Sequence, residues 1–214
     1  MYNTDYLSSE IDWCESNFQT NKYIAEFVNS LTSLFITLCG IIGMYYYDQT
    51  FILYFSLSII GITSYYFHAT LSEFGQMLDE LSIMFCISLS IWFINSYVHR
   101  MINKKTLIYL CIFQFISMII YPILNRLILF TWSIPVLYKF KLYYNLNPKI
   151  RKSVEKIVLL FTLSILCWIV DYICVSFLYP MYLHGWWHIL IGLTGYYIFK
   201  FIDNIMYNLP IYIN

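Results

Sequence analysis

The chain has 214 residues, of which 60% are hydrophobic, 21% are aromatic and only 11% are charged. The charged share is less than half of the roughly 25% that is usual in soluble domains, and the mean hydropathy is +0.65. This composition excludes an ordinary soluble domain and predicts an all-α, polytopic membrane protein. Twelve basic and twelve acidic residues cancel, and no basic patch with interleaved polar loops indicates nucleic-acid binding.

Apolar windows predict a bundle of seven transmembrane helices. Their expected ranges are 23–46, 51–70, 77–98, 106–122, 124–144, 154–177 and 183–202. Only the region around Tyr121 and Pro122 separates the fourth span from the fifth, so a tight turn or a kinked hairpin is expected there. The chain then divides into an acidic N-terminal segment (1–22), a seven-span domain that would carry the chemistry (23–202) and a short tail (203–214).

The basic residues predict which way this bundle faces. Ten of them fall in connections on one side of the membrane, against two on the other. The ten are Arg100, Lys104, Lys105, Lys139, Lys141, Lys149, Arg151, Lys152, Lys156 and Lys200, and the two are Lys22 and Arg126. The positive-inside rule therefore predicts an extracytosolic N-terminus and a cytosolic C-terminus. We expect the protein in the endoplasmic reticulum or Golgi, with the plasma membrane as the alternative.

Three of the four histidines lie at the ends of predicted spans. His184 and His188 are spaced i, i+4, which places both rings on one face of a helix. Ser64 and His68 have the same spacing on another span. Under the predicted orientation these groups and Asp79 all lie in the extracytosolic leaflet. Ionisable groups are costly inside a membrane and usually mark function there.

Three imidazoles with one open coordination position are what a hydrolytic zinc site requires. We therefore expect His68, His184 and His188 to hold a catalytic zinc ion. Asp79 is the candidate general base, and Ser64 is placed to hydrogen-bond the attacking water or the developing oxyanion. The alternative interpretation is that each histidine only caps a helix or bonds to a loop. The pattern favours a membrane-embedded zinc hydrolase.

The acidic N-terminal segment suggests a second cation. Asp12, Glu15 and Asn17 lie at positions i, i+3 and i+5, and Glu26 follows just inside the first span. Oxygen ligands of this kind suit calcium, whose coordination is flexible. A solvated acidic segment or a helix N-cap is the alternative.

Two further features of the sequence stay open at this stage. Asp171, late in the sixth span, either holds a ligand histidine or pairs with another polar group for structure only. Cys14 and Cys174 both lie toward the oxidising side under the predicted orientation. A bridge between them would clip the acidic segment to the end of the sixth span.

In these residues the sequence resembles the alkaline ceramidases, a family of seven-span amidases within a wider superfamily of membrane hydrolases. Each matching segment is a weak signal by itself, but the set occurs in order along the whole chain. The segments are Ile11–Asn17, Tyr23–Phe27, Ser64–Leu71, Gln76–Leu81, Asp171–Cys174 and His184–Leu190.

The resemblance implies zinc-dependent hydrolysis of ceramide (N-acylsphingosine), taken from the bilayer, to a sphingoid base and a fatty acid. It implies a zinc site with two catalytic neighbours, a calcium site and a disulfide. No protein partner is implied. The zinc ligands would be His68, His184 and His188, with Ser64 and Asp79 beside them. The calcium ligands would be Asp12, Trp13 (through its backbone carbonyl), Glu15, Asn17 and Glu26. The disulfide would join Cys14 to Cys174.

Three residues near the expected site depart from the pattern that relatives often show. Thr63 stands in place of Gly, Ser82 in place of Pro and Gly185 in place of Ala. None is an expected ligand, so the chemistry should survive.

Two rival functions are a sister enzyme that cleaves acyl esters of lipid anchors and a seven-span receptor whose zinc is structural.

Overall fold

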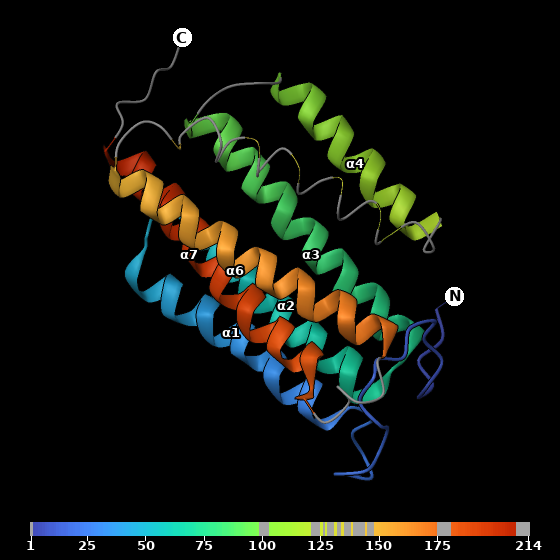
Figure 1. The fold of residues 1–214 in the computed structure, drawn as a ribbon. Coiled ribbons are helices and arrows are strands. Elements are labelled where there is room, and N and C mark those ends of the chain that lie inside the picture. The colour runs from blue at the N-terminus through green and yellow to red at the C-terminus, as the bar shows by residue number, and fades with distance from the viewer. Residues whose placement is uncertain are drawn as a thin grey trace.

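A computed structural model describes residues 2–98, 103–120, 148–174 and 181–208, together with 125, 127, 131, 134, 138 and 144. Within this part of the chain all regular elements are helices, packed side by side (Figure 1). They are α1 (Phe27–Tyr46), α2 (Phe51–Thr70), α3 (Glu73–Phe93), the π-helix η1 (Ile94–Val98), α4 (Lys104–Ile120), α6 (Pro148–Ile173) and α7 (Leu183–Asn208). Among the described residues, five helices are long and apolar enough to cross a membrane: α1, α2, α3 with η1, α6 and α7.

Helix α2 has the predicted bounds, whereas the other described spans differ from the prediction by two to six residues at one or both ends. Helix α1 begins at Phe27 rather than at residue 23, because the N–H groups of Ala25 and Glu26 bond to carbonyls at the end of α2. Helix α7 continues to Asn208 instead of ending at 202, and Asp203 accepts a hydrogen bond from Thr50 at 3.2 Å.

The predicted fifth span, 124–144, lies largely outside the described residues. Helix α4 has 17 residues, at the lower end of the length needed to cross a bilayer. The all-helical, multi-pass class is therefore confirmed, whereas the count of seven spans stays a prediction.

Helix α1 packs against both α2 and α7, and this places the two histidine-bearing helices together. Its contact with α2 is close because small residues face one another, as is common between membrane helices. A side chain at Gly61 would collide with Thr37, and one at Gly40 would collide with Ser58. In this contact the Thr37 hydroxyl donates to the carbonyl of Ser58 at 3.1 Å.

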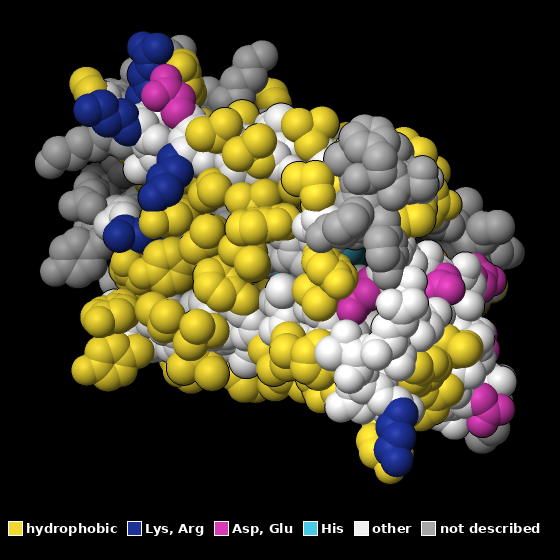
Figure 2. Space-filling view, turned by 60° about the horizontal axis from the view of Figure 1, so that its bottom comes forward, with side chains coloured by type: hydrophobic (Ala, Val, Ile, Leu, Met, Phe, Trp, Pro, Cys, Tyr) yellow, Lys and Arg dark blue, Asp and Glu magenta, His cyan; other side chains and the backbone are white. Residues whose placement is uncertain are grey.

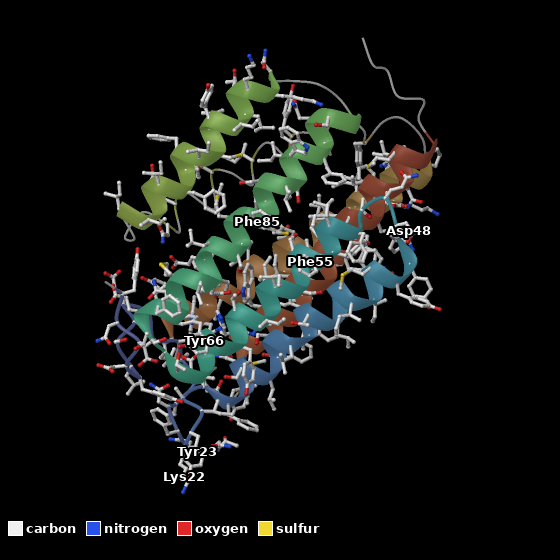
Figure 3. All side chains as sticks on the ribbon, turned by 180° about the vertical axis from the view of Figure 1, so that it is seen from behind. Lys22, Tyr23, Asp48, Phe55, Tyr66 and Phe85 are labelled. Carbon is white, nitrogen blue, oxygen red and sulfur yellow. A yellow bond between two sulfur atoms is a disulfide. The ribbon has the colours of Figure 1, made fainter. Side chains whose placement is uncertain are left out.

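Residues 2–26, which we call the head, cover one end of the bundle (Figure 1). Backbone hydrogen bonds fasten the head to the turn between α2 and α3, from Leu7 N–H to Thr70 O (3.1 Å) and from Ser9 N–H to Leu71 O (2.9 Å). Figure 3 labels Lys22 at the head end of the bundle and Asp48 at the opposite end.

A disulfide between Cys14 and Cys174 confirms the expected clip between the head and the end of α6. Next to it, the Trp13 ring packs edge-on against Trp168 and Tyr172 of α6, with centroids 5.9 and 6.1 Å apart. The head is therefore held both to the turn between α2 and α3 and to the end of α6.

The outer surface of the bundle is mostly apolar, and Figure 2 shows a broad hydrophobic band across one face. Exposed side chains such as Phe55 on α2 and Phe85 on α3 project from the helices (Figure 3). In Figure 2 the Lys and Arg side chains gather mainly at one end of this band, and most Asp and Glu side chains lie at the other. This surface is that of a multi-pass membrane protein.

We expect Cys14→Ser to lower the thermal unfolding midpoint of the purified protein and to remove its sensitivity to reductant. A native disulfide typically contributes about 2–4 kcal/mol to stability, and this one joins residues 160 apart in the sequence. Differential scanning fluorimetry with and without reductant measures the effect. Cys167→Ser, which changes a free thiol on α6, is the matched control. Identical melting of wild type and Cys14→Ser would contradict the clip.

Candidate active site

Three buried histidines meet at the head end of the bundle. His68 lies in the last turn of α2, and His184 and His188 lie in the first turns of α7. Their exposures are 1%, 3% and 1%, and one ring nitrogen from each lies within 4.8 Å of the other two. In the described residues no other three His, Cys, Asp or Glu side chains gather as closely. The predicted convergence of the two helices is confirmed.

Two of the three rings are held by hydrogen bonds at Nδ1. The His68 Nδ1 lies 2.5 Å from the Glu26 carboxylate, and the His188 Nδ1 lies 3.0 Å from the Thr32 hydroxyl. With the proton on Nδ1 in each case, the Nε2 atom is left to bind a metal ion. These contacts fix the orientation of the two rings.

The third ring, that of His184, is held by stacking. The Trp13 ring lies on it with a centroid distance of 3.8 Å. The His184 Nδ1 is buried without a hydrogen-bond partner, which is costly unless another group satisfies it. A metal ion at the cluster would satisfy the ring, so the three histidines fit a zinc site.

The contacts of Asp171 decide between the two roles that the sequence left open for it, holding a ligand histidine or pairing with another polar group. One of its carboxylate oxygens accepts from the backbone N–H of His184 at 3.2 Å, and the other accepts from the backbone N–H of Cys14 at 3.3 Å. Asp171 therefore holds the main chain of a candidate ligand rather than its ring. It satisfies an N–H in the first turn of α7, where helices lack internal acceptors.

Ser64 and Asp79 lie beside the histidines, as predicted. All five side chains line one cavity. The Asp79 Oδ1 atom is buried without a hydrogen-bond partner. A carboxylate next to a hydroxyl in this position has the groups needed to move a proton and to donate to a developing oxyanion.

A second contact joins α2 to α3 directly behind this pair. The Thr63 and Ser82 hydroxyl oxygens are 2.8 Å apart, and the Ser82 hydroxyl also donates to the Asp79 carbonyl at 2.7 Å. Two of the three departures from the pattern of the resembling family are thus in contact with each other. They brace the backbone that carries Ser64 and Asp79.

The cavity has a volume of about 540 Å³, within the roughly 300–1,000 Å³ that is common for ligand sites. Its lining is mostly apolar and comes from α2, α3, α6 and α7, with Trp13 at the head end. Along α3 the lining runs from Gln76 to Ser90, a distance of about 21 Å at 1.5 Å per residue. The shape and lining suit an extended alkyl chain whose polar end reaches the histidines.

The acidic residues of the head have structural contacts of their own. The Glu15 carboxylate accepts from the N–H groups of Val28 and Asn29 at 2.7 and 2.8 Å, so it caps α1. The Asn17 amide donates to both Asp12 carboxylate oxygens at 3.2 Å. The N-cap alternative thus holds for Glu15, and the head carboxylates do not form a second tight group among the described residues.

Two observations nevertheless fit a cation in the head. Burial raises the pKa of Glu15 and raises the pKa of Glu26 to about 8, because the desolvation of these carboxylates outweighs the hydrogen bonds that they accept. The Asn17 side-chain oxygen is buried without a hydrogen-bond partner. Calcium prefers oxygen ligands of this kind, and its binding stays a prediction.

The sequence did not indicate the partners of the histidine rings. Glu26 was expected only as a calcium ligand, and Thr32 was not singled out. Thr32 lies in a polar stretch at the start of the first span, beside Asn29, Ser30 and Ser33, and this pattern does not identify His188 as its partner. The Gln76 side chain, which lines the cavity near Asp79, was noted only as part of a matching segment.

The chain matches known proteins over most of its length. A family model described as Ceramidase matches residues 5–210. Mouse alkaline ceramidase 1 is 31% identical over 210 residues, covering 88% of this chain and 77% of the relative. The human alkaline ceramidase 1 is 32% identical with coverages of 88% and 80%, and the Drosophila melanogaster alkaline ceramidase is 32% identical with coverages of 88% and 74%. From these matches, the chain belongs to the ceramidase family.

Proposed function

We propose that this protein is a zinc-dependent intramembrane amidase that hydrolyses ceramide to a sphingoid base and a free fatty acid. One observation carries the proposal: three buried histidine rings meet at the polar end of a long apolar cavity, with Ser64 and Asp79 in the same wall. Membership of the ceramidase family supports the choice of substrate.

The cavity accounts for substrate binding in this proposal. Its apolar lining would receive an alkyl chain of the lipid directly from the bilayer, because burial of apolar surface is favourable at roughly 25 cal/mol per Å². The amide group at the end of that chain would then lie among the histidines, Ser64 and Asp79. The same lining keeps bulk water away from the reacting groups.

Zinc, when held by His68, His184 and His188, would supply a Lewis acid that polarises the carbonyl and lowers the pKa of a water molecule toward about 7. Asp79 accepts a proton from the attacking water and returns it to the nitrogen of the leaving amine. Ser64 donates a hydrogen bond to the oxygen that becomes negatively charged at the carbonyl carbon. The amide C–N bond breaks, giving a carboxylic acid and a free amine.

Calcium in the head would support this machinery without touching the substrate. Its proposed ligands are Asp12, the carbonyl of Trp13, Glu15, Asn17 and Glu26. The Glu26 carboxylate also contacts His68, and the Trp13 ring stacks on His184. A cation here would offset the burial of the carboxylates and fix the head against the histidines.

We also propose seven spans, with the head and the site on the extracytosolic side of an endoplasmic reticulum or Golgi membrane. The disulfide suits an oxidising compartment. The basic side chains Lys104, Lys152 and Lys200 lie in the parts of α4, α6 and α7 away from the histidines, as the positive-inside rule expects for a cytosolic face.

Purified protein offered a mixed lipid extract is expected to release a sphingoid base and a fatty acid, measured by mass spectrometry. A zinc chelator, His188→Ala and Asp79→Asn should each reduce release by at least a hundredfold, because each removes part of the proposed reaction centre. Asp48→Asn, at the opposite end of the bundle, is the matched control and should retain activity. Near-normal turnover in His188→Ala or Asp79→Asn would refute the assignment.

A glycerolipid ester supplied beside ceramide separates the rival lipid hydrolase from the proposed amidase. We expect cleavage of the amide to dominate. Preferential release of fatty acid from the ester would replace ceramide as the substrate while leaving the hydrolytic site in place.

Glu26→Gln should weaken zinc binding by about 10- to 100-fold, the usual effect of altering a group that orients a ligand histidine. The change keeps the volume of the side chain but replaces one of the two carboxylate oxygens with an amide nitrogen, which cannot accept from His68 Nδ1. Competition with a fluorescent zinc chelator measures the affinity. Glu10→Gln, another acidic residue of the head, is the control. Equal zinc affinities in the two variants would remove Glu26 from this role.

Calcium should raise the thermal unfolding midpoint of the wild type, and chelation should lower it. At a calcium concentration 100-fold above Kd the expected stabilisation is about 2.7 kcal/mol. Asp12→Asn should weaken this response, whereas Asp5→Asn, an exposed acid elsewhere in the head, should not. A midpoint that does not respond to calcium in the wild type would count against the site.

A further inference from the structure

The indole N–H of Trp13 is a hydrogen-bond donor that the proposed mechanism does not use. Trp13 lines the cavity from the head, and its ring stacks on His184 with a centroid distance of 3.8 Å. The Trp13 Nε1 atom is buried without a hydrogen-bond partner. A buried tryptophan usually finds an acceptor for this N–H, so an exception beside the candidate reaction centre calls for an explanation.

Several contacts hold the Trp13 indole in place. Its backbone N–H donates to the Glu26 carboxylate at 3.0 Å, and the next residue, Cys14, is tied to the end of α6 by the disulfide. The ring packs edge-on against Trp168 and Tyr172, with centroids 5.9 and 6.1 Å away. An aromatic face accepts an N–H only weakly, so these contacts orient the ring without replacing a hydrogen bond. The N–H is therefore a preorganised donor, which lowers the entropic cost of binding an acceptor.

A ligand of this donor must bring its own acceptor into the cavity. An indole N–H donates but cannot accept, so an alkyl chain cannot satisfy it, whereas an oxygen atom can. The amide lipid of the proposed function carries three oxygen atoms near the scissile bond, one in the carbonyl and two in hydroxyls. The proposed mechanism already assigns the carbonyl oxygen to the zinc ion and Ser64. A hydroxyl oxygen is therefore the acceptor left for Trp13.

The position of Trp13 selects between the two hydroxyls. The carbon that bears the amide nitrogen has a terminal neighbour with the primary hydroxyl and a second neighbour with the secondary hydroxyl, from which the alkyl chain continues. The cavity lining along α3 begins at Gln76, which bonds to the head, and runs to Ser90. An alkyl chain that follows this lining leads away from the head. The terminal carbon and its primary hydroxyl then face Trp13.

We propose that the Trp13 indole N–H donates a hydrogen bond to the primary hydroxyl oxygen on the amine side of the lipid, which makes Trp13 a specificity-determining residue. The inference rests on the proposed function for the position of the amide. A lipid without this hydroxyl leaves the donor unpaired in the bound state, and the unpaired donor penalises its binding. The head thus contacts the polar end of the lipid, whereas the helices contact its chain.

The test compares lipid analogues on the purified full-length protein. N-acylsphinganine is set beside its 1-deoxy analogue, which lacks the primary hydroxyl, and its 3-deoxy analogue, which lacks the secondary one. For the wild type we expect kcat/KM to fall roughly 3- to 10-fold for the 1-deoxy analogue, the usual effect of losing one neutral hydrogen bond. Any effect of the 3-deoxy change should be the same with and without the Trp13 donor.

Two replacements of Trp13 remove the donor. Trp13→Phe keeps an aromatic ring over His184, and 3-benzothienylalanine at position 13 keeps the size of the ring system with a sulfur atom in place of the N–H. In both variants the ratio of kcat/KM between N-acylsphinganine and its 1-deoxy analogue should shrink toward one. A general disturbance of the histidine cluster would instead lower the rates for all three lipids alike. Trp186→Phe, which changes an exposed tryptophan of α7, is the matched control and should keep the wild-type ratio.

Binding of free sphinganine and 1-deoxysphinganine, measured by native mass spectrometry, makes the test independent of turnover. A preference for sphinganine that disappears in both Trp13 variants supports the contact even where no amide is cleaved, a result that would overturn only the proposed function. A wild type that cleaves N-acylsphinganine and its 1-deoxy analogue equally well would overturn the Trp13 contact and leave the amidase intact. An unchanged ratio in the benzothienylalanine variant would overturn it as well.

Discussion

The buried contact between the Glu26 carboxylate and the His68 ring joins the head to the end of helix α2. Glu26 ends the head and precedes α1, whereas His68 lies in the last turn of α2. The carboxylate also accepts from the Trp13 backbone N–H at 3.0 Å and from the Asn29 amide at 3.0 Å. One fully buried side chain thus fixes a candidate metal ligand, the path of the head and the start of a helix.

Other carboxylates at the head end also accept more than one hydrogen bond, because apolar surroundings leave polar groups few alternatives to internal hydrogen bonds. Asp171 serves two backbone N–H groups that are far apart in sequence, and Glu15 serves two at the start of α1. These carboxylates orient the polypeptide around the histidines. Removing one would disturb the position of a neighbour as well as its own hydrogen bonds.

Much of the fold and the site could be predicted from the sequence, since long apolar runs and i, i+4 histidines are strong local signals. The ends of α2 and the meeting of His68 with His188 are confirmed on that basis. Contacts such as Thr32 with His188 could not be predicted, because they depend on how α1 packs between two other helices. The cap by Glu15 could not be assigned either, since a carboxylate that caps a helix and one that binds calcium have the same local pattern.

The position of the disulfide has a consequence for the order of biosynthesis. Cys14 is made early, but its partner Cys174 follows most of the chain, and two of the three histidines come later still. The nascent protein therefore emerges with its head unfastened and its histidine cluster incomplete. The cluster can assemble only after α7 has been made, so a polypeptide truncated before His184 retains one of the three rings.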